Sequence, residues 1–225
     1  MEASKMTSDI LDWLQRWYSS NCNGDWEFDY GIRINTLANP GWSIFIDVAE
    51  TPLVSAEFTP ITIEREEHDW IHCRVREWRF EGFGGPSNLI ELLETFRSWT
   101  SKAAGKQTAS LPVGSEENDS GKVLRWIQGW YHSHCDGEWE RAKGIRIKTV
   151  DNPGWSMFIN LSNTELSEVA FAPLRMDRGQ DGWIQCQVLD DRFKGTCGLH
   201  NLTELLATFR AWANSSGNGG GRNGS

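Results

Sequence analysis

The sequence lacks any apolar run that approaches the roughly 18 residues of a membrane-spanning helix. Its N-terminal stretch places Glu2, Asp9 and Asp12 where a signal peptide needs apolar residues, so we expect no export by that route and a cytoplasmic location. Basic residues are also in deficit, because 22 Lys and Arg stand against 31 Asp and Glu, giving a net charge of −9. Broad nucleic-acid binding needs a basic surface, so we expect neither a membrane nor a nucleic acid as a direct partner.

Cysteine is sparse among the 225 residues and is not arranged in pairs. The five thiols form an odd set with no Cys-x-x-Cys spacing: Cys22, Cys73, Cys135, Cys186 and Cys197. This pattern is more typical of reduced, buried thiols than of a disulfide framework or a zinc site. Tryptophan is abundant instead, with 13 residues against 10 Phe and 3 Tyr, and so aromatic a chain is too hydrophobic to be disordered.

The chain is one sequence written twice with a constant offset of 113. Leu11–Tyr18 recurs as Leu124–Tyr131, and Asn39–Ser43 recurs as Asn152–Ser156. The offset holds without a gap from Ser8 to Thr100, and 44 of these 93 positions are identical. We therefore predict two tandem repeats of one fold, copy one (6–104) and copy two (121–214). A flexible linker (105–120), rich in Ser, Gly and acidic residues, would join them, and a disordered tail (215–225) would follow.

Each copy reads as an α+β unit. Ile10, Trp13, Leu14 and Trp17 have helical spacing, and Leu89 begins a similar stripe that runs to Trp99. Alternating apolar residues between them predict four or five strands in an antiparallel meander, with the N-terminal and C-terminal helices covering one face. Two local details are also expected. Asn39-Pro40-Gly41-Trp42 suits a type II turn with Gly41 at positive φ, and Asn88 with Glu91 resembles a capping box.

Most tryptophans fall on periodic faces or at strand starts, so we assign core packing to Trp13, Trp17, Trp42, Trp70 and Trp99. Trp26, its counterpart Trp139, and Trp78 fall in loops. Trp26 is either an anchor for a partner or a plug over the sheet, and the sequence does not separate the two.

The sequence contains no convincing catalytic or metal-binding motif, so we expect a protein that is not an enzyme and that binds no metal or cofactor. His132-x-His134-Cys135 has metal-like residues, but positions i and i+2 on a helix face different ways, and copy one carries Ser19 and Asn21 there. No nucleophile elbow or phosphate loop is present, and no His occurs in both copies. A pocket that brought Glu27, Arg33 and Arg79 together would revive an enzymatic hypothesis.

The acidic charge belongs to one part of the chain. Residues 1–104 carry 9 basic against 17 acidic residues, whereas residues 121–225 carry 12 against 11. The acidic residues of copy one gather in two loops, Asp25/Glu27/Asp29 and Glu64/Glu66/Glu67/Asp69. Such a surface either keeps the protein in solution or steers a basic protein partner toward it.

The ordered motifs carry a resemblance to a known family. Leu11-x-Trp13-Leu14, Trp17-Tyr18, Cys22-x-Gly24-x-Trp26-Glu27, Gly31-Ile32, Asn39-Pro40-Gly41-Trp42, Phe80-x-Gly82 and Asn88-Leu89 are similar to the immunity protein 53 family of bacterial polymorphic-toxin systems. The resemblance implies a cytoplasmic protein that binds and neutralises a cognate toxin domain, such as a nuclease. The tandem duplication departs from the single domain expected of that family and leaves open which copy binds.

The candidate partner-binding residues are the loop carboxylates and loop tryptophans, namely Asp25, Trp26, Glu27, Asp29, Glu66, Glu67, Asp69, Trp78 and Trp139. The alternative function is a small-ligand module that holds a sugar or a nucleotide with its loop tryptophans.

Overall fold

The structure, a computed structural model, describes residues 10–105, 119–142, 144–179 and 182–217. Copy one contains α1 (Ile10–Asn21), α2 (Trp26–Asp29), β1 (Ile32–Leu37), β2 (Gly41–Asp47), β3 (Ile61–Glu66), β4 (Asp69–Arg76), β5 (Arg79–Gly84) and α3 (Leu89–Ala103). Copy two repeats this order with α4 (Asp119–Ser133), α5 (Trp139–Ala142), β6 (Ile145–Val150), β7 (Gly154–Asn160), β8 (Leu174–Asp177), β9 (Trp183–Leu189), β10 (Arg192–Gly198) and α6 (Leu202–Gly217). The predicted α+β class is confirmed in both copies.

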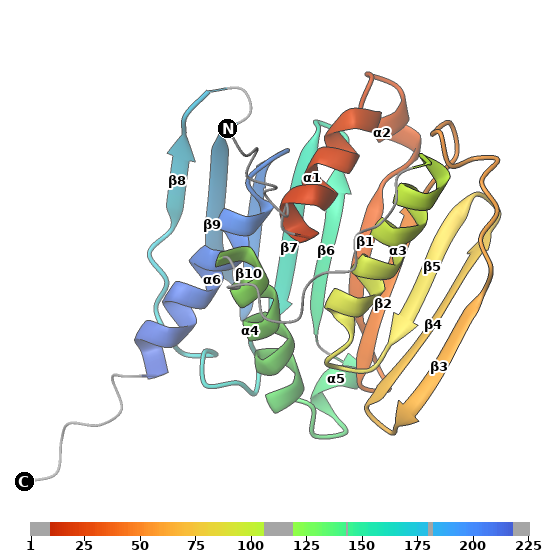
Figure 1. The fold of residues 1–225 in the computed structure, drawn as a ribbon. Helices are drawn as coiled ribbons and strands as arrows, with labels where there is room; N and C mark the ends of the chain where they lie inside the picture. Colours follow the sequence, from red (N-terminus) through yellow and green to blue (C-terminus); the bar gives the residue numbers. More distant parts are fainter. Residues whose placement is uncertain (1–9, 106–118, 143, 180–181, 218–225) are drawn as a thin grey trace, which may run out of the picture.

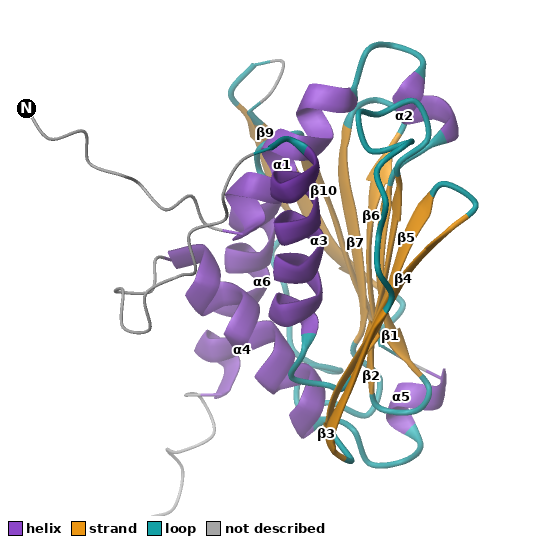
Figure 2. Cartoon of the chain, turned by 45° about the vertical axis from the view of Figure 1, so that its right-hand side comes forward, coloured by secondary structure: helices purple, strands orange, loops and turns teal. Residues whose placement is uncertain are grey.

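All ten strands belong to one antiparallel sheet, in the order β3-β4-β5-β2-β1-β6-β7-β10-β9-β8 (Figure 1). The four long helices α1, α3, α4 and α6 cover one face, and the other face is free of them (Figure 2). Within each copy the order differs from a simple meander, because β5 lies between β2 and β4. The connection 48–60 is long enough to cross to the sheet edge, so the chain returns from β3 toward β2.

The two copies meet where β1 pairs with β6. Ile34 lies opposite Ile147, with Arg33 opposite Lys148 and Asn35 opposite Arg146. We call this β1–β6 contact the seam, and one threonine from each copy accepts a hydrogen bond from the other copy across it. The Ile32 amide donates to Oγ1 of Thr149 at 3.0 Å, and the Ile145 amide donates to Oγ1 of Thr36 at 3.0 Å. The copies are therefore continuous by backbone pairing.

Each first helix also reaches across the seam. The Tyr18 hydroxyl of α1 donates to the Val150 carbonyl at 3.1 Å, and the Tyr131 hydroxyl of α4 donates to the Leu37 carbonyl at 3.2 Å. The Tyr131 ring packs edge-on against Trp42 at 5.0 Å between centroids. Burial raises the pKa of both phenols far above the ordinary value, so the hydroxyls stay protonated and available as donors.

The predicted capping box at Asn88 and Glu91 is wrong, because the Asn88 side chain makes no cap hydrogen bond. The first amides of α3 and α6 are instead satisfied from the other copy. Oε1 of Gln128 accepts the Ile90 amide at 3.0 Å, and Oε1 of Gln15 accepts the Leu202 amide at 2.7 Å. Each C-terminal helix is thus capped by the first helix of the opposite repeat.

The type II turn expected before β2 is also wrong, since Gly41 is not among the residues with positive φ. Gly41 is needed for a close approach instead: a Cβ there would lie 2.3 Å from the Gly84 carbonyl oxygen on β5. Its amide donates to the Tyr131 hydroxyl at 3.0 Å, so this glycine serves the contact between copies as well.

The predicted linker and tail fall largely outside the described residues. Helix α4 begins at Asp119, within the last residues of that linker, and α6 runs to Gly217, past the start of the predicted tail. Among the described residues, no helix combines the length and the apolar character that crossing a bilayer requires.

Candidate functional site

The acidic loop of copy one surrounds a hollow on the helix-free face of the sheet. Its volume is about 650 Å³, and the residues lining it are Glu64, Arg65, Glu66, Glu67, Trp70, His72 and Phe83. Glu66 and Glu67 are exposed, and neither has an ion-pair partner among the described residues. We call this hollow the acidic hollow: carboxylates form its rim, and aromatic side chains of β4 and β5 form its floor.

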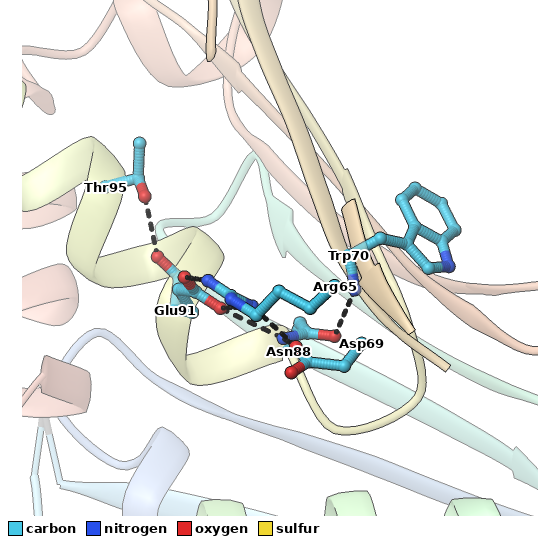
Figure 3. A network of polar contacts seen from close by, with 6 residues as sticks. All are labelled: Arg65, Asp69, Trp70, Asn88, Glu91 and Thr95. Carbon is cyan, nitrogen blue, oxygen red and sulfur yellow. Dashed lines mark hydrogen bonds and ion pairs between the residues drawn. The ribbon is translucent and has the colours of Figure 1, made fainter. Parts of the chain in front are cut away.

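Trp70 was assigned to the core from the sequence, and the structure places it elsewhere. Ile71 and Cys73 of β4 are buried under the helices, so strand alternation turns Trp70 and His72 to the opposite face. Figure 3 shows the Trp70 ring pointing away from the polar groups at the start of α3. The alternation of side chains along β4 is the sequence signal that predicts this aromatic floor: Ile71 and Cys73 are the apolar core positions, so Trp70 and His72 must face the other way.

Asp69 differs from the other two candidate carboxylates of its loop. It joins a polar network that ties the β3–β4 turn to α3 (Figure 3). Its Oδ1 accepts from Asn88 at 2.8 Å and from Arg65 at 2.5 Å, and Arg65 also pairs with Glu91. The hydrogen bond from Asn88, followed by that from Arg65, holds the pKa of Asp69 below its usual range. Asp69 therefore positions the hairpin, which leaves Glu66 and Glu67 as its available charges.

The second acidic loop is built around a buried indole. Trp26 is 1% exposed and donates from Nε1 to the Ala49 carbonyl at 2.8 Å, and Trp139 is 2% exposed and donates likewise to Ser162. This burial fits the plug, one of the two alternatives that the sequence leaves open for Trp26. The ligand-module hypothesis loses its main support, because neither indole offers a surface to a ligand.

Glu27 is also buried and accepts the Asn23 and Gly24 amides at 3.0 Å each, so it fixes its own loop. Asp25 and Asp29 remain exposed at this end of the sheet. Trp78 is 63% exposed at the β4–β5 turn, where its φ is 57°. The strand registers put this end opposite the β3–β4 turn, so these residues do not join the acidic hollow.

The three residues considered as catalytic candidates do not come together in one pocket. Glu27 binds its own loop, Arg79 pairs with Asp47 at 2.6 Å, and the Arg33 guanidinium lies 5.8 Å from the Phe45 ring centroid. No cluster of three potential metal ligands occurs within the described ranges. His134 instead contacts the Trp130 carbonyl through Nδ1 at 2.7 Å and Glu165 through Nε2 at 2.6 Å.

The cysteines are free thiols in the structure. Burial raises the pKa of Cys73 and of Cys186 to about 12 each, so both remain protonated near neutral pH. Neither has the low pKa that a nucleophilic thiol needs, and both pack as small apolar groups.

Comparison with known proteins gives a match to one family. A model of the family described as immunity protein 53 matches residues 11–101 and, separately, residues 124–214. The two matched segments cover most of the chain and coincide with the two copies of the fold. No curated protein and no solved structure matches the chain.

Proposed function

The chain belongs to the immunity protein 53 family, and on this premise we propose that it is a non-enzymatic inhibitor that binds and neutralises a cognate toxin domain in the cytoplasm. Immunity protein families act in general by binding a toxin partner. The further step, that the contact is made by the acidic hollow of copy one, is our inference from its geometry.

We assign the toxin contact to the acidic hollow because it combines a carboxylate rim with an aromatic floor. Glu66 and Glu67 stand exposed at the rim, and Trp70 lies on the floor. A Lys or Arg side chain entering the hollow would meet carboxylates at its charged end and an indole face beneath it. The surrounding charge would also speed the approach of a basic protein, such as a toxin that acts on nucleic acid.

Copy two lacks this arrangement. The positions equivalent to Glu66, Glu67 and Asp69 hold Gly179, Gln180 and Gly182, so its hairpin lacks these three carboxylates, although it carries Asp177 and Asp181. This difference supports assigning the toxin contact to copy one. Copy two then has the role of completing the sheet and capping α3 through Gln128.

The experiment is co-expression of the chain with the toxin encoded beside its gene. Glu66→Lys combined with Glu67→Lys should abolish rescue of growth and lower the association rate constant by at least about ten-fold, because steering and rim contacts are both lost. Binding of purified proteins at several salt concentrations measures the rate constants. The salt dependence should be steeper for the native chain than for the variant.

The matched control is Asp25→Lys combined with Asp29→Lys. It makes the same change of charge on exposed residues at the opposite end of the sheet. Rescue should survive this variant. If the Glu66/Glu67 variant is folded and still rescues as well as the native chain, the acidic hollow is not the toxin contact.

A further inference from the structure

The two halves of the helix-free face differ in how their cations are balanced, because Arg74, Arg76 and Arg79 of copy one all pair with carboxylates. From the seam outward through copy two, strand alternation turns a set of basic residues to this face. We call this set the cationic face: Arg33 of β1, Arg146 and Lys148 of β6, Arg175 of β8, and Arg192 and Lys194 of β10. Asp177, at the end of β8, is the acidic residue that alternation adds to the copy-two half. The unequal charge of the two copies in the sequence therefore appears on this face as an excess of unpaired cations, among the described residues, on the copy-two half.

In copy one, the same fold gives arginines on this face carboxylate partners. There, Arg79 pairs with Asp47 at 2.6 Å and Arg74 pairs with Glu81 at 2.7 Å across neighbouring strands. The positions equivalent to Asp47 and Glu81 are Asn160 and Lys194 in copy two. Arg192, the equivalent of Arg79, thus loses its carboxylate on an otherwise matching backbone.

No member of the cationic face has a carboxylate within ion-pair distance among the described residues. Arg33 lies over the Phe45 ring, with its guanidinium 5.8 Å from the ring centroid. Bringing several cations onto one face without counter-charges costs free energy through their mutual repulsion, and an anionic partner would relieve that repulsion.

The surface is also shaped to receive side chains. A hollow of about 620 Å³ crosses the seam and is lined in part by Asn35, Arg146, Phe158 and Arg192. A second, of about 250 Å³, is lined in part by Arg175 and Lys194. Phe158 is 36% exposed within the first hollow, which gives the face an apolar contact beside its charges.

We propose that the cationic face binds an acidic segment of a protein partner, with Asp and Glu side chains laid across β6, β7 and β10. This inference goes beyond the proposed function, because it concerns the copy that the toxin contact does not use. The face spans the strands from β1 to β8, about 24 Å at the usual strand spacing, which suits a short segment.

The charges around the face favour a protein over a nucleic acid. A phosphate backbone long enough to leave the cationic face would find Arg74 and Arg79 already paired with carboxylates on the copy-one half. Beyond them it would meet the exposed Glu66 and Glu67, on a chain whose net charge is −9. A short run of carboxylates can end before it reaches them. A second copy of this chain, which could offer its own acidic hollow, is distinguished by the experiment.

The test measures binding of fluorescein-labelled poly-L-glutamate to the full chain by fluorescence anisotropy. Binding should be detectable at low salt and should weaken steeply as salt is added. Lys194→Glu combined with Asn160→Asp installs the residues that copy one carries at these positions. It should weaken binding about ten-fold or more, because it adds negative charge and gives Arg192 a counter-ion.

Two further variants separate this site from the toxin contact. Glu81→Lys combined with Asp47→Asn gives copy one the residues of copy two, and it should strengthen polyglutamate binding. Glu66→Gln combined with Glu67→Gln should leave the effect of the Lys194/Asn160 substitutions unchanged, whatever it does to rescue from the toxin. The melting temperature of each variant establishes that it is folded.

Three results would overturn the proposal. One is polyglutamate binding that is absent or is insensitive to the Lys194/Asn160 substitutions. Another is tighter binding of a single-stranded oligonucleotide than of polyglutamate at the same salt concentration, which would point to a nucleic acid. The third is a concentration-dependent dimer in sedimentation that the same substitutions dissolve, which would identify a second copy as the occupant.

Discussion

Single residues at the seam explain part of the identity between the copies. Gly31 begins the Gly31-Ile32-Arg33-Ile34 motif, and a Cβ at that position would lie 2.2 Å from Oγ1 of Thr149 in the other copy. Gly144, its counterpart, has the same relation to Thr36 at 2.0 Å. The motif is therefore a requirement of the β1–β6 contact, since a side chain at either glycine would displace the threonine that binds the neighbouring amide.

Gly31→Ala should destabilise the chain by about 1–3 kcal/mol, because Thr149 must rotate and give up its bond to Ile32. The midpoint of urea unfolding measures this loss. Gly129→Ala is the control: Gly129 lies within α4, and a Cβ there would have nothing within 4 Å. That substitution should stabilise the chain by about 0.5–1 kcal/mol through helix propensity. Equal effects from both substitutions would mean that the seam does not constrain Gly31.

At the scale of elements, the caps of the C-terminal helices come from the opposite copy. Gln15 is 2% exposed, and its carbonyl oxygen accepts the Leu202 amide in a buried setting, whereas the bond that the Ile90 amide donates to Gln128 is only partly buried. Removing an acceptor from a buried donor costs more than removing it from a donor that water can reach.

Gln15→Ala should therefore cost about 2–3 kcal/mol of unfolding free energy, and Gln128→Ala about 1 kcal/mol. Equilibrium urea unfolding of the three proteins gives the comparison. Gln185→Ala, on an exposed position of β9, is the control and should change stability by less than about 0.5 kcal/mol. The reverse order of the two losses would contradict the assignment of the buried cap to Gln15.

The sequence predicts the elements of each copy well, because hydrophobic periodicity within a copy depends on neighbours close along the chain. It cannot predict the seam in the same way. Tyr18 and Gln15 fit the helical pattern of α1 like any other residue, yet they act on Val150 and Leu202, more than a hundred positions away. The site is similar. The acidic rim can be read directly from consecutive acidic residues, whereas its aromatic floor can be predicted only when the two faces of β4 are assigned correctly.

The capping box failed for a related reason. Asn88 and Glu91 have the spacing of a cap, but Arg65 and Asp69 compete for their side chains once β3 and β4 are in place. A local motif is overridden here by charged partners that only the fold brings near. The cationic face cannot be predicted from a local motif at all, because its members lie on four strands and form no run in the sequence.

At the scale of the whole molecule, the two copies behave as one folding unit. The β1–β6 pairing, the reciprocal threonine and glutamine bonds, and the Tyr131–Trp42 contact all join copy one to copy two. The arrangement has the character of a two-fold dimer whose subunits have been fused, with Ile34 and Ile147 at the centre. The fusion then allows the two halves of the open face to carry different charges, which an identical pair could not do.

This view predicts that the covalent connection is dispensable once the protein has folded. A protease site inserted between residues 106 and 118 and then cut should leave one particle of unchanged size on native gel filtration, although two fragments separate under denaturing conditions.

Cutting removes the high effective concentration that the connection supplies, so a substitution that weakens the seam should have a larger effect on the cut protein than on the uncut chain. Gln15→Ala should leave the uncut chain intact but should make the cut particle dissociate on dilution at concentrations where the cut native chain does not. If the native fragments part as soon as the connection is cut, the seam does not hold the copies together, and the picture of a fused dimer fails.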